Sequence, residues 1–198
     1  MREVDDRRSP ASRVIWLVFI AGAIGGTLLD QIHVRSHVLH YAHPRAAGEA
    51  WWVVPEFGAA ATVALLSAMW ITKRQWRAPR DGVPIVADAS TFVVAYTVTG
   101  VLHRHSWIVL IVLMGLWAAL IAVHRDRRAF ITMSVSLAIV GPIYEGAFAS
   151  TGAFRYDVRP LIGGVPVWLP ALYLIAGMLA ASIARAATRA RRTEISRS

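Results

Sequence analysis

The sequence predicts an all-α polytopic membrane protein built as a bundle of six transmembrane helices. Three observations support this fold class: 56% of the 198 residues are hydrophobic, the mean hydropathy is +0.49, and apolar runs close to the ~20 residues that cross a bilayer recur along the chain. The basic residues cluster between these runs and at the two ends, as they do in membrane loops. The net charge of +9 therefore does not indicate nucleic-acid binding.

Six spans are expected, and each must be a helix because a segment in lipid has to satisfy its own backbone hydrogen bonds. The charged stretch 1–13 precedes an apolar run that has no clean cleavage site, which favours a retained first span over a removed signal peptide. The domain organisation is then a tail at 1–13, a membrane domain at 14–184 and a basic tail at 185–198. The expected spans are 14–29, 50–72, 83–101, 106–124, 129–150 and 165–184.

The second span carries the most information. It reads AWWVVPEFGAAATVALLSAMW from Ala50 to Trp70. The tryptophan pair at its start suits the headgroup level of a bilayer. Small residues from Gly58 onward allow a neighbouring helix to approach closely. One acid, Glu56, lies inside the apolar run.

The distribution of Lys and Arg predicts the orientation. Counted alternately from the N-terminus, the odd-numbered segments outside the spans hold sixteen of the 21 basic residues and the even-numbered segments hold five. The positive-inside rule then places both termini in the cytoplasm. Many Ala and Arg residues beside a single Lys indicate a high-GC bacterial genome, for which the membrane would be the inner (plasma) membrane.

Three acids lie within apolar runs: Glu56, Asp88 and Glu145. Because an ionised carboxylate at mid-bilayer costs at least ~2.5 kcal/mol, such groups face the bundle interior, are protonated or have partners. Glu56 and Glu145 both fall in the outer half and are expected to meet. For them a polar floor for a ligand, a proton path and a structural hydrogen bond all remain open. For Asp88, in the inner half, the structural hydrogen bond is favoured.

Prolines and glycines interrupt four of the six spans, and kinked helices in a small bundle leave space between them. The expected ligand site is such a cavity, with apolar walls and one or two polar groups that orient the ligand. The candidate ligand-binding residues are Trp52 and Phe57 as walls and Glu56, Tyr144 and Glu145 as polar groups.

Histidines suggest an alternative. On a continued helix, the spacing of His33, His37, His40 and His43 forms one stripe. His103 and His105 lie on the same side of the membrane. Imidazole suits zinc, copper and iron. Membrane di-iron hydroxylases, however, combine HxxxH with HxxHH, and only HxxxH occurs here. An interfacial amphipathic stretch is therefore favoured, and no metal or cofactor is expected. The chain has no cysteine, which excludes thiolate ligands and nucleophiles.

Several motifs resemble those of one family. The matching stretches are Ala50-Trp51-Trp52-Val53 with Pro55 and Gly58, Leu28-Leu29 with Gln31-Ile32, Gly115-Leu116-Trp117, Asp126-Arg127, Gly152 with Phe154 and Tyr156, and Trp168-Leu169-Pro170. In this order they resemble the AWWVPP, LLQI, GLW, DRSR, GVYQY and WLP motifs of the Insig (insulin-induced gene) proteins. That family consists of six-span membrane proteins that bind oxysterols in the endoplasmic reticulum.

The resemblance implies the six-span fold and a non-catalytic, lipid-sensing role. The expected partner is one amphipathic lipid, sterol-like or diacylglycerol-like, held within the bundle. Asp126 stands at the DRSR aspartate with which the family engages an escort protein, so the resemblance makes it a partner-binding residue for an unidentified membrane protein. Homo-oligomers are also expected.

Two other functions remain open. One is a metal-dependent lipid-modifying enzyme that uses the histidine cluster; a stoichiometric transition metal lost on His37→Ala would favour it. The other is a small proton-coupled transporter, which predicts a pH-dependent flux that stops on Glu56→Gln.

Overall fold

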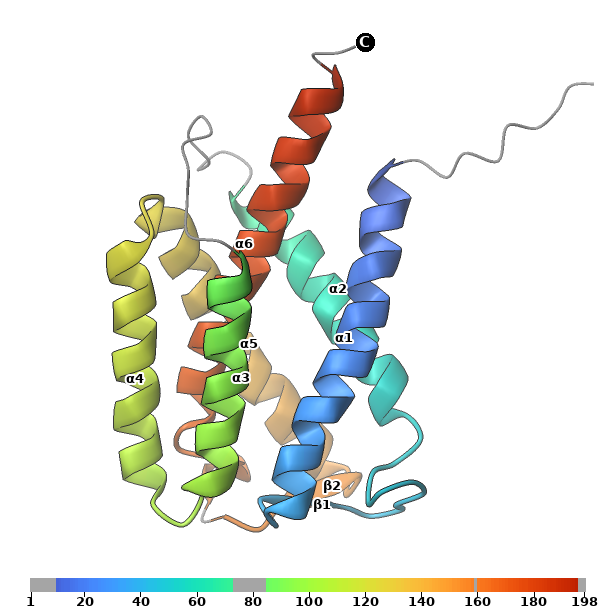
Figure 1. Cartoon of the computed structure of the whole chain (residues 1–198). Helices are drawn as coiled ribbons and strands as arrows, with labels where there is room; N and C mark the ends of the chain where they lie inside the picture. Colours follow the sequence, from blue (N-terminus) through green and yellow to red (C-terminus); the bar gives the residue numbers. More distant parts are fainter. Residues whose placement is uncertain (1–9, 73–84, 159, 196–198) are drawn as a thin grey trace, which may run out of the picture.

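Six helices run back and forth along a common direction in the part of the chain that the structure describes, with short strands at one end (Figure 1). The structure is a computed structural model, and it describes residues 10–72, 85–158 and 160–195. The helices are α1 (Pro10–Arg35), α2 (Val53–Thr72), α3 (Ile85–Val101), α4 (Ser106–Val123), α5 (Arg127–Ser150) and α6 (Leu169–Ile195). The strands are β1 (Leu39–Tyr41), β2 (Phe154–Tyr156), β3 (Pro160–Ile162) and β4 (Val165–Pro166).

Each predicted span corresponds to one helix. Five of them (α1, α2, α4, α5 and α6) are long and apolar enough to cross a membrane, whereas α3 is a shorter apolar helix of 17 residues. The predicted third span also included residues 83 and 84, which lie outside the described residues. The all-α six-helix architecture is thus confirmed.

Two helices are longer than predicted. The first continues six residues beyond Leu29 to Arg35, because the polar side chains in that stretch find partners inside the bundle, as described below. The last helix continues to Ile195, so most of the stretch expected as a basic tail is helical. Alanine and arginine are both strong helix formers, which explains this extension.

The bundle has two distinct ends. The strand end carries β1, β2 and the α3–α4 turn, whereas α1 begins, α2 ends and α6 ends at the opposite end (Figure 1). We call this opposite end the basic end; the basic residues there include Arg13, Arg125, Arg127, Arg128, Arg185 and Arg189. The alternation of helices matches the predicted alternation of loops. The assignment of the basic end to the cytoplasm stays a prediction.

A turn at His37 ends α1 and turns the chain toward the strand end. His37 has a φ of +54°, in the left-handed region. The Val38 N–H donates to the His33 carbonyl at 2.8 Å, and the His37 N–H donates to the Val34 carbonyl at 3.2 Å. This pair of bonds is the Schellman arrangement that commonly ends helices, although glycine is the usual residue at the left-handed position. The following residues form β1, which pairs antiparallel with β2, with Tyr41 opposite Phe154.

Small residues allow close packing of α1 on α2. A Cβ atom on Gly22 would lie 2.4 Å from the Ala61 Cβ, and one on Gly26 would lie 2.5 Å from the Phe57 ring. Gly58 likewise lies against the ring of Phe19. The predicted small-residue face of the second span is therefore a helix–helix contact. It joins α1 and α2 into a pair that packs beside α6.

Candidate functional site

Four acidic side chains gather at the strand end, close enough for their charges to act on one another. Asp30 comes from the last turns of α1, Glu49 from the loop before α2, Glu56 from the first turn of α2, and Glu145 from α5. We call these four residues the carboxylate cluster. Asp30 and Glu49 are buried, whereas Glu56 and Glu145 are half-buried. Glu56 and Glu145 approach each other, as the sequence predicts.

Glu145 accepts hydrogen bonds from two tyrosines. The Tyr173 hydroxyl of α6 donates to Glu145 Oε1 at 2.6 Å. The Tyr156 hydroxyl of β2 donates to the other carboxylate oxygen. Burial and the charge of Glu145 both raise the pKa of Tyr156, which keeps that tyrosine a neutral donor. Each carboxylate oxygen of Glu145 therefore has a fixed partner from a different element.

Asp30 and Glu49 are held in a similar way. The Tyr41 hydroxyl of β1 donates to Asp30 Oδ2 at 2.6 Å, and the Gln31 amide donates to Glu49 Oε1 at 2.5 Å. Burial raises the pKa of Tyr41, and the neighbouring Asp30 charge adds to this effect. Burial also raises the pKa of Glu49, against the opposing hydrogen bond from Gln31. The paired strands β1 and β2 thus supply one tyrosine to an acid of α1 and one to an acid of α5.

Glu56 differs from the other acids of the carboxylate cluster in having a half-exposed partner. Its partner is the Tyr144 hydroxyl, which joins α2 to α5. Tyr144 is 47% exposed. In a membrane-spanning helix that surface faces lipid or a lipid-filled space. Glu56 and Tyr144 are therefore a polar pair of which one member, Tyr144, is half exposed.

The structure brings four of the five predicted ligand residues together and separates the fifth. Trp52 packs beside the polar pair, with its ring centroid 4.8 Å from that of Phe148 on α5 and 5.3 Å from that of Tyr41. Phe57 instead covers Gly26 of α1. Because consecutive residues on a helix point in directions about 100° apart, Glu56 and Phe57 face different neighbours. The role of all five in ligand binding stays a prediction.

Sequence reasoning missed the tyrosines and Asp30. Asp30 directly follows the apolar run of the first span, so it looked like a loop residue. Tyr41, Tyr156 and Tyr173 lie far along the chain from their carboxylates or across a turn. The only sequence signal for these partners is the presence of tyrosines near the outer loops. Their hydroxyl groups can donate the hydrogen bonds that a half-buried carboxylate requires.

The histidine stripe that a continued helix would give does not form. The turn at His37 ends the helix, so His40 lies on β1 and His43 in the following loop. His33 is buried in α1, with Nε2 2.7 Å from Thr99 Oγ1 and Nδ1 4.0 Å from Asp30 Oδ1. His40 pairs with Asp157. Within residues 10–72, 85–158 and 160–195, no three His, Asp or Glu side chains are arranged to hold a metal ion.

The basic end holds a second polar network, around Asp88 of α3. Asp88 is 0% exposed, and its Oδ1 lies 2.9 Å from Nε2 of His124, the residue after α4. The Ser182 hydroxyl of α6 donates to the other carboxylate oxygen. His124 stacks on Phe130 of α5 with centroids 3.8 Å apart. The predicted structural hydrogen bond of Asp88 is confirmed, and it joins three helices.

Arg185 and Asp126 lie next to this network. The Arg185 guanidinium carbon is 5.2 Å from the centroid of the Phe130 ring. Asp126 is half-buried at the N-terminus of α5, makes no side-chain capping bond, and acts electrostatically on Arg185. Its proposed contact with a protein partner remains a prediction.

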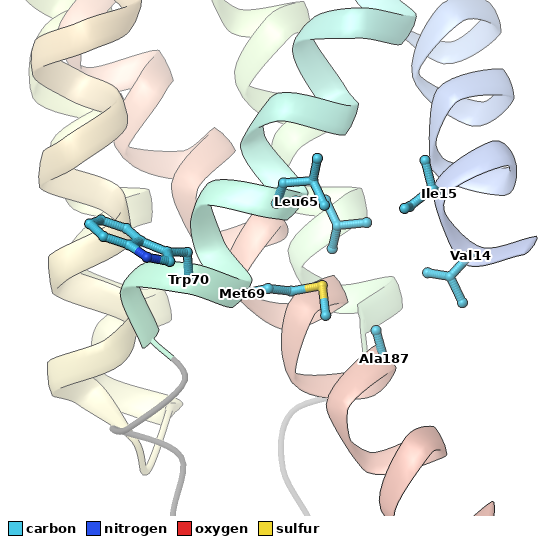
Figure 2. A pocket seen from close by; sticks show the side chains of 7 residues that line it. Val14, Ile15, Leu65, Met69, Trp70 and Ala187 are labelled. Carbon is cyan, nitrogen blue, oxygen red and sulfur yellow. The ribbon is translucent and has the colours of Figure 1, made fainter. Parts of the chain in front are cut away.

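A pocket of about 300 Å³ opens between α1, α2 and α6 at the basic end. In Figure 2, Leu65 and Met69 of α2 face Val14 and Ile15 of α1, and Ala187 of α6 closes one side. The lining side chains are mostly aliphatic, with one tryptophan. The pocket lies at the opposite end of α2 from Glu56, and none of the five predicted ligand residues lines it.

The comparisons with known proteins place the fold. The chain matches no protein-family model. No curated protein matches it either. Two solved structures share its fold: an Insig homologue, MvINS, from Mycobacterium vanbaalenii, and a cross-linked trimer of an MvINS variant. Each has a TM-score of 0.76 and 24% sequence identity, and the match covers 89% of this chain and 94% of that chain. With its long apolar helices, the chain is therefore an integral membrane protein with the fold of a mycobacterial Insig homologue.

Proposed function

We propose that the protein is a non-catalytic membrane lipid sensor that binds one amphipathic lipid, sterol-like or diacylglycerol-like, with the polar end of the lipid at Glu56 and Tyr144. The observation that carries the proposal is that the half-buried Glu56 is hydrogen-bonded to a tyrosine that is 47% exposed. The likeness of the fold to an Insig homologue supports it.

The contrast between the two glutamates of the cluster supports the choice of residues. Glu145 has a tyrosine on each oxygen, so a ligand would have to displace two fixed donors. Glu56 shares one bond with a half-exposed tyrosine. A ligand hydroxyl can replace that tyrosine hydroxyl without leaving a buried group unpaired, which is the costly outcome.

Aromatic rings supply the apolar part of the site. Trp52, Phe148 and Tyr144 form a continuous cluster across α2 and α5, with Tyr144 and Phe148 centroids 5.8 Å apart. Such flat apolar surfaces around a few polar groups are typical of small-molecule sites. Glu145 and Phe57 then support the site without touching the ligand. Glu145 holds α5 to α6, and Phe57 holds α2 to α1.

Mass spectrometry of co-purifying lipids tests the proposal. One lipid class should be enriched at about one molecule per chain in the wild type. Because a hydrogen bond to a charged group contributes roughly 1.5–3 kcal/mol, Glu56→Gln and Tyr144→Phe should each reduce retention about tenfold or more. Thr97→Val is the matched control, since the Thr97 hydroxyl is exposed and bonds only to its own helix. Bulk lipid alone in every sample would refute the proposal.

Self-association and a protein partner belong to the same proposal. One of the similar structures is a cross-linked trimer of MvINS, which supports a homo-oligomer here. Light scattering of the detergent-solubilised chain, corrected for bound detergent, measures the number of copies.

The Asp126 surface at the basic end is the proposed contact for a membrane-protein partner, by resemblance to the Insig motif.

A further inference from the structure

The paired strands β1 and β2 join two loops that are far apart in the chain, one after α1 and one after α5 (Figure 1). We call this pair the strap. Backbone bonds extend it by one residue at each end: the Ala42 N–H donates to the Ala153 carbonyl at 3.0 Å, and the Asp157 N–H donates to the Val38 carbonyl at 2.9 Å. Because a two-stranded ribbon is marginally stable by itself, its closure depends on the side chains of its two faces.

The inner face of the strap lies against the aromatic cluster of the proposed lipid site. The Tyr41 ring of β1 meets the Trp52 ring edge-on, with centroids 5.3 Å apart at 77°. The Phe154 ring of β2 lies 5.9 Å from the Phe148 ring of α5. Trp52 and Phe148 belong to different helices, and each is contacted by a different strand. The strap therefore covers the aromatic cluster at the strand end.

The outer face of the strap is polar and exposed. His40 of β1, whose side chain is 47% exposed, pairs with Asp157, which directly follows β2. Arg155 lies opposite His40, and its Nε is 3.3 Å from Asp157 Oδ1. The His37 ring stacks on that of His40. Exposed ion pairs contribute little to stability and are weakened by salt. These contacts therefore hold the strap closed without making closure permanent.

We propose that the strap is a gate, which opens to admit and release the lipid of the proposed site. This gate rests on the proposed function, since it regulates that same site. Opening draws Tyr41 away from Asp30 and Tyr156 away from Glu145, and water can replace these hydrogen bonds once the strand end is open. A lipid in the site packs on the aromatic cluster that the strap covers, so binding favours the closed state.

A reversible disulfide across the strap tests the gate. His40 and Arg155 are direct neighbours across the strands, and the Cα atoms of such a hydrogen-bonded pair are about 5.5 Å apart, within the range of a disulfide. The variant is His40→Cys combined with Arg155→Cys. The wild-type chain has no cysteine, so no competing disulfide forms, and it is the control for the oxidant and the reductant.

The measurement is the exchange of a fluorescent diacylglycerol between detergent micelles and the full-length chain. Uptake and release should both be about tenfold slower or more in the oxidised variant than in the reduced one, because opening of a lid limits exchange at a gated site. A purely structural effect of the disulfide would change the final occupancy without slowing both rates. The comparison of two redox forms of one variant removes the effect of the substitutions themselves.

Asp157→Asn tests the outer ion pairs separately. It removes their charge and keeps the size of the side chain, so release should be about twofold to fivefold faster, the range for one exposed ion pair. High salt should speed release from the wild type in the same way and change the variant little. Arg104→Gln is the charge control, since that exposed arginine lies in the α3–α4 turn at the same end. Release from Asp157→Asn at the wild-type rate would contradict the role of the ion pairs.

The failure of the gate and the failure of the proposed function give different results. Equal rates in the oxidised and reduced forms would overturn the gate and leave the proposed lipid site standing. No uptake of the diacylglycerol by the wild type would refute the proposed function, and the gate with it. Glu56→Gln, introduced into the double-cysteine variant, should lower the occupancy in both redox forms and preserve the difference between their rates.

Discussion

The two ends of the bundle hold their buried acids by different means. At the basic end, Asp88 is fully buried and bonded to His124 and Ser182 on two other helices. At the strand end, the partners of Asp30, Glu56 and Glu145 are tyrosine hydroxyls, and Tyr144 is half exposed. The comparison teaches that an acid in a membrane protein can have one of two roles, according to its partner and the exposure of that partner. A fully buried acid with buried partners, such as Asp88, is a fixed joint between helices. An acid with a half-exposed partner, such as Glu56, offers a hydrogen-bond acceptor for which a ligand can compete.

The largest expected effect is the loss of the fixed joint. Asp88→Ala leaves His124 and the Ser182 hydroxyl buried without their partner. Removing one member of a buried pair costs roughly 3–5 kcal/mol. The free energy of unfolding, measured by denaturant titration in detergent, should fall by about this amount, with a much smaller loss for Asp88→Asn. A loss below about 1 kcal/mol would show that the two ends do not differ in this way.

A medium loss in the free energy of unfolding is expected when Glu145 loses one of its two tyrosine donors. Tyr173→Phe removes one donor from the carboxylate and keeps the ring that packs against Gly141. The remaining bond from Tyr156 limits the loss to roughly 1–2 kcal/mol. The same denaturant titration measures it. A loss as large as that of Asp88→Ala would mean that the strand end is as rigid a joint as the basic end.

A smaller, pH-dependent effect is expected at Glu49. Burial raises its pKa in the folded state above the usual 4.5. The folded protein therefore keeps the proton to a higher pH than the unfolded chain does, so this group favours folding at low pH and that contribution is lost as the pH rises above 4.5. Unfolding midpoints recorded against pH should decline over this window in the wild type. They should decline less in Glu49→Gln, whereas an unchanged profile would exclude Glu49 as the source.

The smallest effect on stability is expected at Glu56. Glu56→Gln keeps an acceptor for the half-exposed Tyr144, so the unfolding free energy should change by no more than about 0.5 kcal/mol, as for surface substitutions. Lipid retention should nevertheless fall. If Glu56→Gln loses both stability and lipid, Glu56 has a structural role like that of Asp88. The two ends of the bundle would then not differ.

The helices could be predicted from sequence because each is a separate apolar run and hydrophobic length is a local property. The structural role of Asp88 was also accessible, since a carboxylate at that depth needs a partner. The end of α1 could not be predicted from sequence, because His37 occupies the left-handed position where glycine is the usual signal. The histidine stripe, which required a continued helix, does not form for this reason.

The site was predicted in part. Glu56 and Glu145 were expected at the same end of the bundle because both lie near the outer ends of their spans, and they lie close enough there for their charges to interact. Their tyrosine partners depend on how β1 and β2 pair across more than a hundred residues, which no local pattern encodes. Phe57 lies against Gly26 of α1, because neighbouring residues on a helix face different elements, and its role in ligand binding stays a prediction. The pocket at the basic end was missed because it arises from the angle between α1, α2 and α6.

The pairing of β1 with β2 also sets the order in which the protein can be assembled. Tyr41 leaves the ribosome soon after α1, but its opposite residue, Phe154, follows only after four more helices. At about 5–20 residues per second, that delay is roughly 6 to 23 s. Through this interval the two strands cannot join, and Glu145 has neither of its tyrosines. The strand end therefore cannot close until β2 has been made, and a chain stopped before β2 exposes the acids of α1 and α2 to the membrane and its insertion machinery.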